Sequence, residues 1–159
     1  MWWVLNKQVL ENMLASLKYF KEMDNVLIFP SDKNRKIYPV YAKEYEFQVD
    51  ISRKGHKLTK CTFQLRRGNT KLYRIDLIGR EHTNPPGDYK YANQSIECPH
   101  IHTIRHQLGL SVALPVEEGL IAIPDDELSY MINGFRYFME EVNIANRHDI
   151  KCIANENLI

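Results

Sequence analysis

The sequence predicts an α+β protein, in which an antiparallel meander sheet of about five to six strands is flanked by an N-terminal and a C-terminal helix on one face. Apolar residues recur at helical spacing near both ends of the chain, and they alternate with polar residues through its middle. No internal repeat or linker divides the 159 residues. We therefore expect a single domain, residues 1–159, with a buried hydrophobic core.

The first helix is expected over residues 6–24. Asn6 can cap its N-terminus, and the pattern should stop near Asp24 and Asn25. The apolar residues of this segment share one helical face: Leu10, Met13, Leu14, Leu17 and Phe20.

The sheet is expected over about residues 26–116. It begins with the apolar run 26–29 and continues with 37–41, where Pro39 favours an edge position. Three segments then alternate polar and apolar residues and are separated by turns that contain glycine: 45–51, 61–66 and 71–78. Extended segments at 99–105 and 111–116 complete the sheet.

The second helix is expected over residues 125–143. Its acidic start, Asp125 to Glu127, suits the positive end of a helix dipole. A helical stripe of apolar residues follows: Leu128, Met131, Ile132, Phe135, Phe138, Met139 and Val142. The C-terminal tail, 147–159, adds at most a short segment at 150–154.

The composition excludes several classes of protein. The chain is 44% hydrophobic and 26% charged, with a formal net charge of +1, which argues against global disorder and against attraction of the whole molecule to nucleic acid. No apolar run approaches the roughly 18–20 residues of a membrane helix, so we expect a cytoplasmic protein without a membrane partner. Cys61, Cys98 and Cys152 lack disulfide or zinc-knuckle spacing, and we expect reduced thiols.

Three histidines are the strongest candidates for chemistry. His82 lies in a long loop, and His100 and His102 are two residues apart on an expected strand, so their rings share one face. Cleavage of RNA through its 2′-hydroxyl needs one group that takes a proton and another that donates one near neutral pH. The sequence therefore predicts His100 and His102 as catalytic acid and base, with His82 completing the site.

Two polar residues of the strand at 71–78 would support this site, if that strand pairs with the histidine strand in a compatible register. Arg74 would stabilise the negative charge that grows on the phosphate, because its guanidinium fits phosphate oxygens. Asp76 would orient one imidazole through a ring nitrogen.

Two other interpretations of the histidines stay open. They can simply pack and hydrogen-bond within the fold, or His82, His100 and His102 can bind a metal ion, with Cys98 as a further ligand of a structural site. The H-x-H order followed by Gln107 is similar to a cupin metal motif, but the cupin glutamate and the glycine-rich second motif are missing. We expect no cofactor.

Basic residues give a candidate nucleic-acid-binding surface: Arg53, Lys54, Lys57 and Arg105. Lysine and arginine bind nucleic acid mainly through its phosphates. The same residues are also consistent with the solvated turns of a meander. The chain has no nucleophile elbow, phosphate-binding loop or dinucleotide-binding fingerprint.

Spaced motifs cover roughly the middle half of the chain, at residues 47–55, 60–64, 74–77, 82–85 and 98–102. Together they resemble a family of small uncharacterised bacterial proteins, often found in phages, plasmids and other mobile elements. The Arg74-x-Asp76 strand and the His100-x-His102 strand are also similar to TumE-type toxins of toxin–antitoxin systems. After His102 the relatives tend to read tyrosine–arginine–glutamate, whereas this chain reads isoleucine–arginine–histidine–glutamine.

The leading hypothesis is a toxin-like protein of a mobile element that acts on RNA by histidine acid–base chemistry, with a cognate antitoxin as a further partner. The alternative is an anti-defence, anti-CRISPR-like inhibitor from a phage or plasmid, which binds a host nuclease without catalysis. A structural domain with neither role is the third interpretation. The sequence carries no signal for an oligomeric state.

Overall fold

A computed structural model describes residues 2–21, 25–30, 34–54 and 60–154. Its elements follow the chain in this order: α1 (Trp2–Ala15), β1 (Tyr19–Phe20), β2 (Val26–Phe29), β3 (Arg35–Tyr41), β4 (Glu46–Lys54), β5 (Lys60–Arg67), β6 (Thr70–Ile78), β7 (His82–Thr83), β8 (Ser95–Ile96), β9 (His100–Thr103), η1 (Gly109–Ser111), β10 (Leu114–Pro115), α2 (Glu127–Glu141), η2 (Arg147–Asp149) and β11 (Lys151–Ala154).

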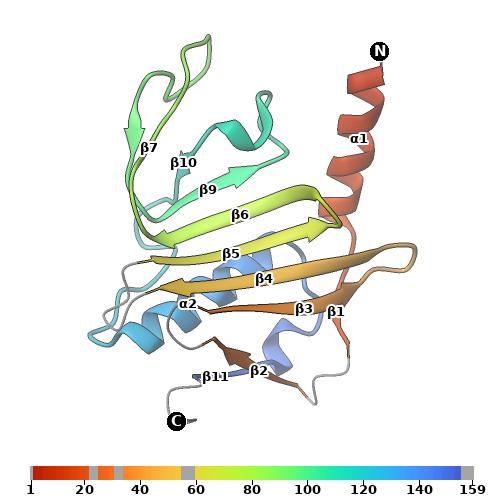
Figure 1. The fold of residues 1–159 in the computed structure, drawn as a ribbon, viewed down its shortest axis with the longest axis vertical. Coiled ribbons are helices and arrows are strands. Elements are labelled where there is room, and N and C mark those ends of the chain that lie inside the picture. The colour runs from red at the N-terminus through yellow and green to blue at the C-terminus, as the bar shows by residue number, and fades with distance from the viewer. Residues whose placement is uncertain (1, 22–24, 31–33, 55–59, 155–159) are drawn as a thin grey trace.

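A seven-stranded antiparallel sheet is the centre of the described part of the chain (Figure 1). Its strand order is β1-β3-β4-β5-β6-β9-β10, so the long strands β3 to β6 form the expected meander. The α2 helix lies across one face of the sheet, and α1 lies beside the sheet (Figure 1). The α+β prediction is therefore confirmed, and the short strands β1 and β10 bring the sheet to seven strands.

The core lies between the sheet and α2. Along β4, β5 and β6, alternate residues face the helix because side chains in a strand alternate between the two faces. Phe63 of β5 packs against Phe135 and Phe138 of α2, with ring centroids 5.0 and 6.0 Å away. Gly134 lets the helix approach β6: a Cβ atom there would lie 2.6 Å from Leu77 Cδ2.

The second helix begins and ends close to its predicted bounds. The Asp126 carboxylate accepts a hydrogen bond from the Ser129 backbone N–H at 2.8 Å, which caps the N-terminus of α2. Most of the predicted apolar stripe is buried. Neither helix in the described part of the chain is long and apolar enough to cross a membrane.

The first helix is shorter than the sequence predicts at its C-terminal end. It starts at Trp2 and ends at Ala15, and not at residue 24. The chain then turns at the buried Lys18, whose ammonium donates hydrogen bonds to the carbonyls of Leu14 at 2.7 Å and Val142 at 2.9 Å. This cation satisfies carbonyls that a helix end leaves unpaired, and it joins the end of α1 to the end of α2.

Two predictions for apolar segments are wrong: one concerns the element in which Phe20 lies, and the other concerns the strand that pairs with the run 26–29. Phe20 fits the helical pattern of the first segment, but it lies in β1 and pairs with Val40 of β3. The run 26–29 is a strand, β2, as predicted, but it lies outside the meander. It pairs in parallel with β11, which comes from the C-terminal tail.

Candidate functional site

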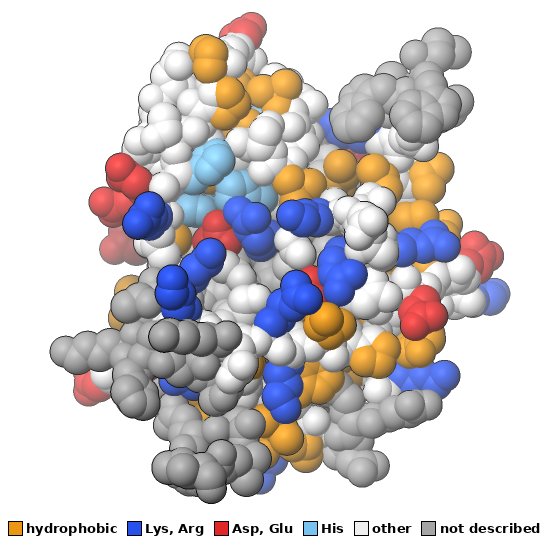
Figure 2. Space-filling model, viewed as in Figure 1, with side chains coloured by type: hydrophobic (Ala, Val, Ile, Leu, Met, Phe, Trp, Pro, Cys, Tyr) orange, Lys and Arg blue, Asp and Glu red, His pale blue; other side chains and the backbone are white. Residues whose placement is uncertain are grey.

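The site lies on the face of the sheet opposite α2, where the neighbouring strands β5, β6 and β9 place polar residues side by side. In one row, Arg74 of β6 pairs with Gln64 of β5 and with His102 of β9. In the next row, Asp76 pairs with Thr62 and His100. The register between β6 and β9 therefore brings together the two polar pairs that the sequence singled out, and this face is turned to the viewer in Figure 2.

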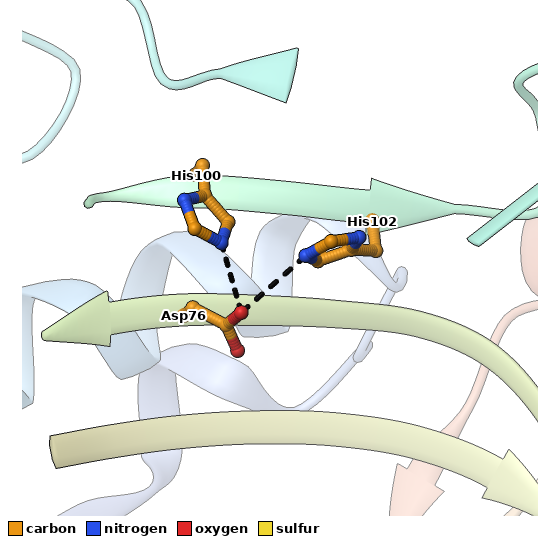
Figure 3. A group of neighbouring side chains, drawn as sticks. All are labelled: Asp76, His100 and His102. Atoms are coloured by element: carbon orange, nitrogen blue, oxygen red, sulfur yellow. Dashed lines mark hydrogen bonds and ion pairs between the residues drawn. The ribbon is translucent and has the colours of Figure 1, made fainter. Parts of the chain in front are cut away.

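The rings of His100 and His102 both point at Asp76 (Figure 3). Asp76 Oδ2 lies 2.9 Å from His100 Nε2 and 3.4 Å from His102 Nε2. The two ring centroids are 5.1 Å apart, and each histidine side chain is only 1% exposed. The histidines thus form a compact cluster with Asp76 at its centre.

Backbone carbonyls fix the orientation of both rings. Nδ1 of His100 lies 3.0 Å from the Ile96 carbonyl oxygen, and Nδ1 of His102 lies 2.8 Å from the Leu110 carbonyl oxygen. A carbonyl oxygen only accepts hydrogen bonds, so each Nδ1 carries the proton and donates it. The Nε2 atom of each ring is therefore the one aimed at Asp76.

His100 carries a second proton in this arrangement, because its Nε2 hydrogen-bonds the Asp76 carboxylate. Burial by itself lowers the pKa of His100, but the hydrogen bonds to Asp76 and Cys98 outweigh it and raise that pKa to about 10. His102 differs, since its buried Nε2 has no hydrogen-bond partner. The cluster therefore contains one hydrogen-bonded imidazolium and one ring nitrogen without a partner.

Asp76 is the anion that holds the cluster together. Arg74 donates two hydrogen bonds to it, from Nε to Oδ1 at 2.8 Å and from Nη2 to Oδ2 at 3.0 Å. Burial by itself raises the pKa of Asp76, and the hydrogen bonds from His100 and Arg74 hold that pKa well below its usual range. Arg74 thus reaches the histidines through Asp76.

His82 lies next to the cluster. Its ring centroid is 5.0 Å from that of His102 and 6.3 Å from that of His100, but its Nε2 hydrogen-bonds the Ser111 carbonyl at 2.9 Å. The loop that carries it is held by the buried Asn84, which donates to the Ala113 carbonyl and accepts from the Ala113 N–H. Asn84 is a positioning residue that the sequence analysis did not single out, because Asn in a Pro/Gly loop usually signals only a turn.

The candidate metal ligands differ from the set considered from the sequence. Among the described residues, Asp76, His100 and His102 bring their ligand atoms within 4.8 Å of one another. His82 is not part of this group. Cys98 lies on the other side of the His100 ring, with its Sγ 3.8 Å from Nδ1, so it faces away from the point where the Nε2 atoms converge.

Two grooves on this face run beside Asp76. One has a volume of about 530 Å³ and is lined by Lys54, Lys60 and Arg80 together with Asp76. The other has a volume of about 260 Å³ and is lined by Lys60, Arg35 and Arg74 together with Asp76. Figure 2 shows Lys and Arg side chains spread over this face beside the histidines.

The predicted nucleic-acid-binding residues lie in different places. Arg53 and Lys54 line a neighbouring groove with Arg35 and Lys60. Arg105 follows β9 and lines none of these grooves; its charge acts on Lys18. Lys57 lies outside the described residues. The sequence did not single out Arg35 and Arg80, because only the folded structure shows that they border the same face as Lys60.

The fold and the cluster define an α+β protein with a two-histidine, one-carboxylate centre on the open face of its sheet. By sequence, residues 5–144 match the model of a family of unknown function, DUF6978, and the chain belongs to that family. No match was found among curated proteins, and none among solved structures.

Proposed function

We propose that this chain is a toxin-like protein that acts on RNA at the open face of its sheet. The observation that carries this proposal is the set of basic side chains that line the two grooves beside Asp76: Arg35, Lys54, Lys60, Arg74 and Arg80. A row of cations beside a cluster of imidazoles suits a polymer of phosphates whose 2′-hydroxyl is the reacting group. The resemblance to TumE-type toxins supports the same class.

The charge balance of the grooves favours an anionic ligand. The two carboxylates that line them, Asp50 and Asp76, already accept hydrogen bonds from Arg66 and Arg74. Lys60, exposed at the start of β5, borders all three grooves on this face. Phosphate groups that lie in the grooves would therefore meet cations and no uncompensated carboxylate among the described lining residues.

Lys60→Ala is expected to weaken RNA binding several-fold and to lower the salt dependence by about one counterion, because one phosphate contact is lost. The measurement is fluorescence anisotropy of a labelled single-stranded RNA over a salt series, with DNA of the same sequence as the comparison. Lys151→Ala is the matched control, since Lys151 is an exposed lysine on β11 in a different sheet. Equal affinity of both variants for RNA would contradict the proposal.

RNA cleavage is expected to join the 2′-oxygen to phosphorus and release the 5′-oxygen, leaving a 2′,3′-cyclic phosphate and a 5′-hydroxyl. His102→Gln is expected to lower the rate at least about 100-fold. The assay follows end-labelled RNA with and without EDTA. Cleavage that persists in EDTA and is lost in the variant supports histidine acid–base chemistry; wild-type cleavage that the variant retains in full contradicts a role for the cluster.

Burial of the histidine rings favours a second candidate function. His100 and His102 are each 1% exposed, and a ring nitrogen that reacts with RNA has to reach it. The chain would then be an anti-defence inhibitor whose surface binds a host nuclease without catalysis. Stoichiometric inhibition of a purified CRISPR effector, in the absence of RNA cleavage by the chain itself, is the result that distinguishes this function.

A further inference from the structure

We propose that Asp76, His100 and His102 form a binding site for one divalent transition-metal ion. The ligand atoms are Asp76 Oδ2 and the Nε2 atoms of the two histidines. This inference depends on the geometry of the cluster and not on RNA being the ligand of the open face; while the ion is bound, the two Nε2 atoms are ligands and do not act as acid and base.

The spacing of the three atoms suits a single ion. Ligand atoms that surround Zn²⁺ tetrahedrally at about 2.0–2.1 Å lie roughly 3.3 Å from one another. In the structure, Asp76 Oδ2 is 2.9 Å from His100 Nε2 and 3.4 Å from His102 Nε2. Both distances are close to that spacing, and all three ligand atoms lie within 4.8 Å of one another.

The backbone hydrogen bonds of the two rings are those of metal-ligating histidines. Such a histidine almost always donates its other ring N–H to a carbonyl or a carboxylate, which fixes the ring and its tautomer. Here the Ile96 carbonyl accepts from His100 Nδ1 and the Leu110 carbonyl accepts from His102 Nδ1. Both Nε2 atoms are left to face Asp76.

The unpartnered nitrogen of His102 points to a ligand independently. Its Nε2 is buried in a side chain that is 1% exposed, and it has no hydrogen-bond partner. A buried polar atom without a partner costs about 1–3 kcal/mol. Because Nδ1 of this ring carries the proton, Nε2 has a lone pair that is directed to the position between Asp76 and His100.

Arg74 is compatible with an ion at this position. It binds Asp76 from Nε to Oδ1 and from Nη2 to Oδ2, and each carboxylate oxygen has two lone pairs. The ion would take the place of the hydrogen that His100 Nε2 now directs at Oδ2, while Arg74 keeps the carboxylate in position. Two imidazoles favour zinc, cobalt, iron or nickel over magnesium or calcium.

Three protein ligands leave a coordination position for water or a substrate. Asp76 borders both grooves of the open face, so the ion would lie next to the proposed RNA path. His82, whose ring packs on His102, is not one of the ligands.

The test measures metal binding by the full chain without RNA. Chelator-treated protein is titrated with Zn²⁺ by calorimetry and with Co²⁺ by its visible absorption. We expect one ion per chain, a raised melting temperature on addition of Zn²⁺, and affinity at least about tenfold lower in His102→Gln. His148→Ala is the control, since His148 lies on η2 outside the cluster, and His82→Ala is expected to bind like the wild type.

His102→Gln keeps a side chain that can hydrogen-bond Leu110, and circular dichroism checks that it folds; Asp76→Asn is the second ligand variant. Absence of saturable binding by the wild type would overturn the site, and so would equal affinity in the wild type and His102→Gln. RNA binding measured in EDTA tests the proposed function separately. Failure of one proposal is therefore distinguishable from failure of the other.

Discussion

Asp76→Asn is expected to lower the free energy of unfolding by about 3–5 kcal/mol, the usual cost of removing one partner from a buried ion pair. Asp76 is the only carboxylate in the described part of the chain that pairs with Arg74 and His100. Without its charge, the imidazolium of His100, which is 1% exposed, faces Arg74 with no anion between them. The measurement is urea denaturation at pH 7 in EDTA, so that no metal contributes.

A double variant separates the ion pair from other effects of this substitution. The double variant Asp76→Asn/His100→Gln removes both charges. Its loss of unfolding free energy should be smaller than the sum of the losses in the two single variants. Asp125→Asn is the control, because Asp125 is exposed, and it should change stability by less than about 0.5 kcal/mol. Strict additivity of the two single variants would mean that the ion pair is not what Asp76→Asn destroys.

Lys18→Met is expected to cost about 3 kcal/mol of stability. The Lys18 Nζ is fully buried and hydrogen-bonds the carbonyls of Leu14, Ser16 and Val142 at 2.7, 2.8 and 2.9 Å. Methionine fills a similar volume but leaves three carbonyls without this donor, at about 1 kcal/mol or more each. Thermal and urea unfolding measure the loss, and Lys151→Met on an exposed strand is the matched control.

The pH dependence of the stability difference between the wild type and Lys18→Met tests whether the buried Lys18 has a lowered pKa. Burial, and secondarily the charge of Arg105, lowers the pKa of Lys18 from 10.5 to about 7. Between pH 7 and pH 10.5 the Lys18 side chain is protonated in the unfolded chain and neutral in the folded chain. The stability of the wild type therefore rises with pH over this range, relative to that of Lys18→Met. The deficit of the variant should therefore widen from pH 7 to 10, by at most about 5 kcal/mol, and stay constant below pH 7. A deficit that narrows over this range would contradict the lowered pKa.

Local patterns predicted the elements that depend on neighbours in the chain. The alternation in β6 placed Arg74 and Asp76 on one side of the strand, and the H-x-H spacing placed the two imidazoles together, because both follow from the period of two. The acidic start of α2 predicted its N-terminus within two residues, since Asp126 caps the next turn of its own helix.

Contacts between segments far apart in the chain determine where the first helix ends and which strand pairs with β2. Nothing in the local pattern predicts that the first helix stops at Ala15, because the Val142 carbonyl that Lys18 binds lies 124 residues away. Likewise, the run 26–29 was a recognisable strand, but its partner β11 comes from the opposite end of the chain. Apolar periodicity reports which face is buried and carries no information about the neighbour that buries it.

Residue periodicity alone predicts an α+β protein in which one strand carries two imidazoles on the same side and another strand carries an Arg–Asp pair on the same side. The pairing of β9 with β6, which puts Asp76 opposite His100, arises only when the chain folds. Folding also buries both rings, and the carbonyls of Ile96 and Leu110 turn them onto one carboxylate. Register and burial arise from packing between segments far apart in the chain, and the chemistry of an imidazole depends on which of its nitrogens that packing leaves without a partner.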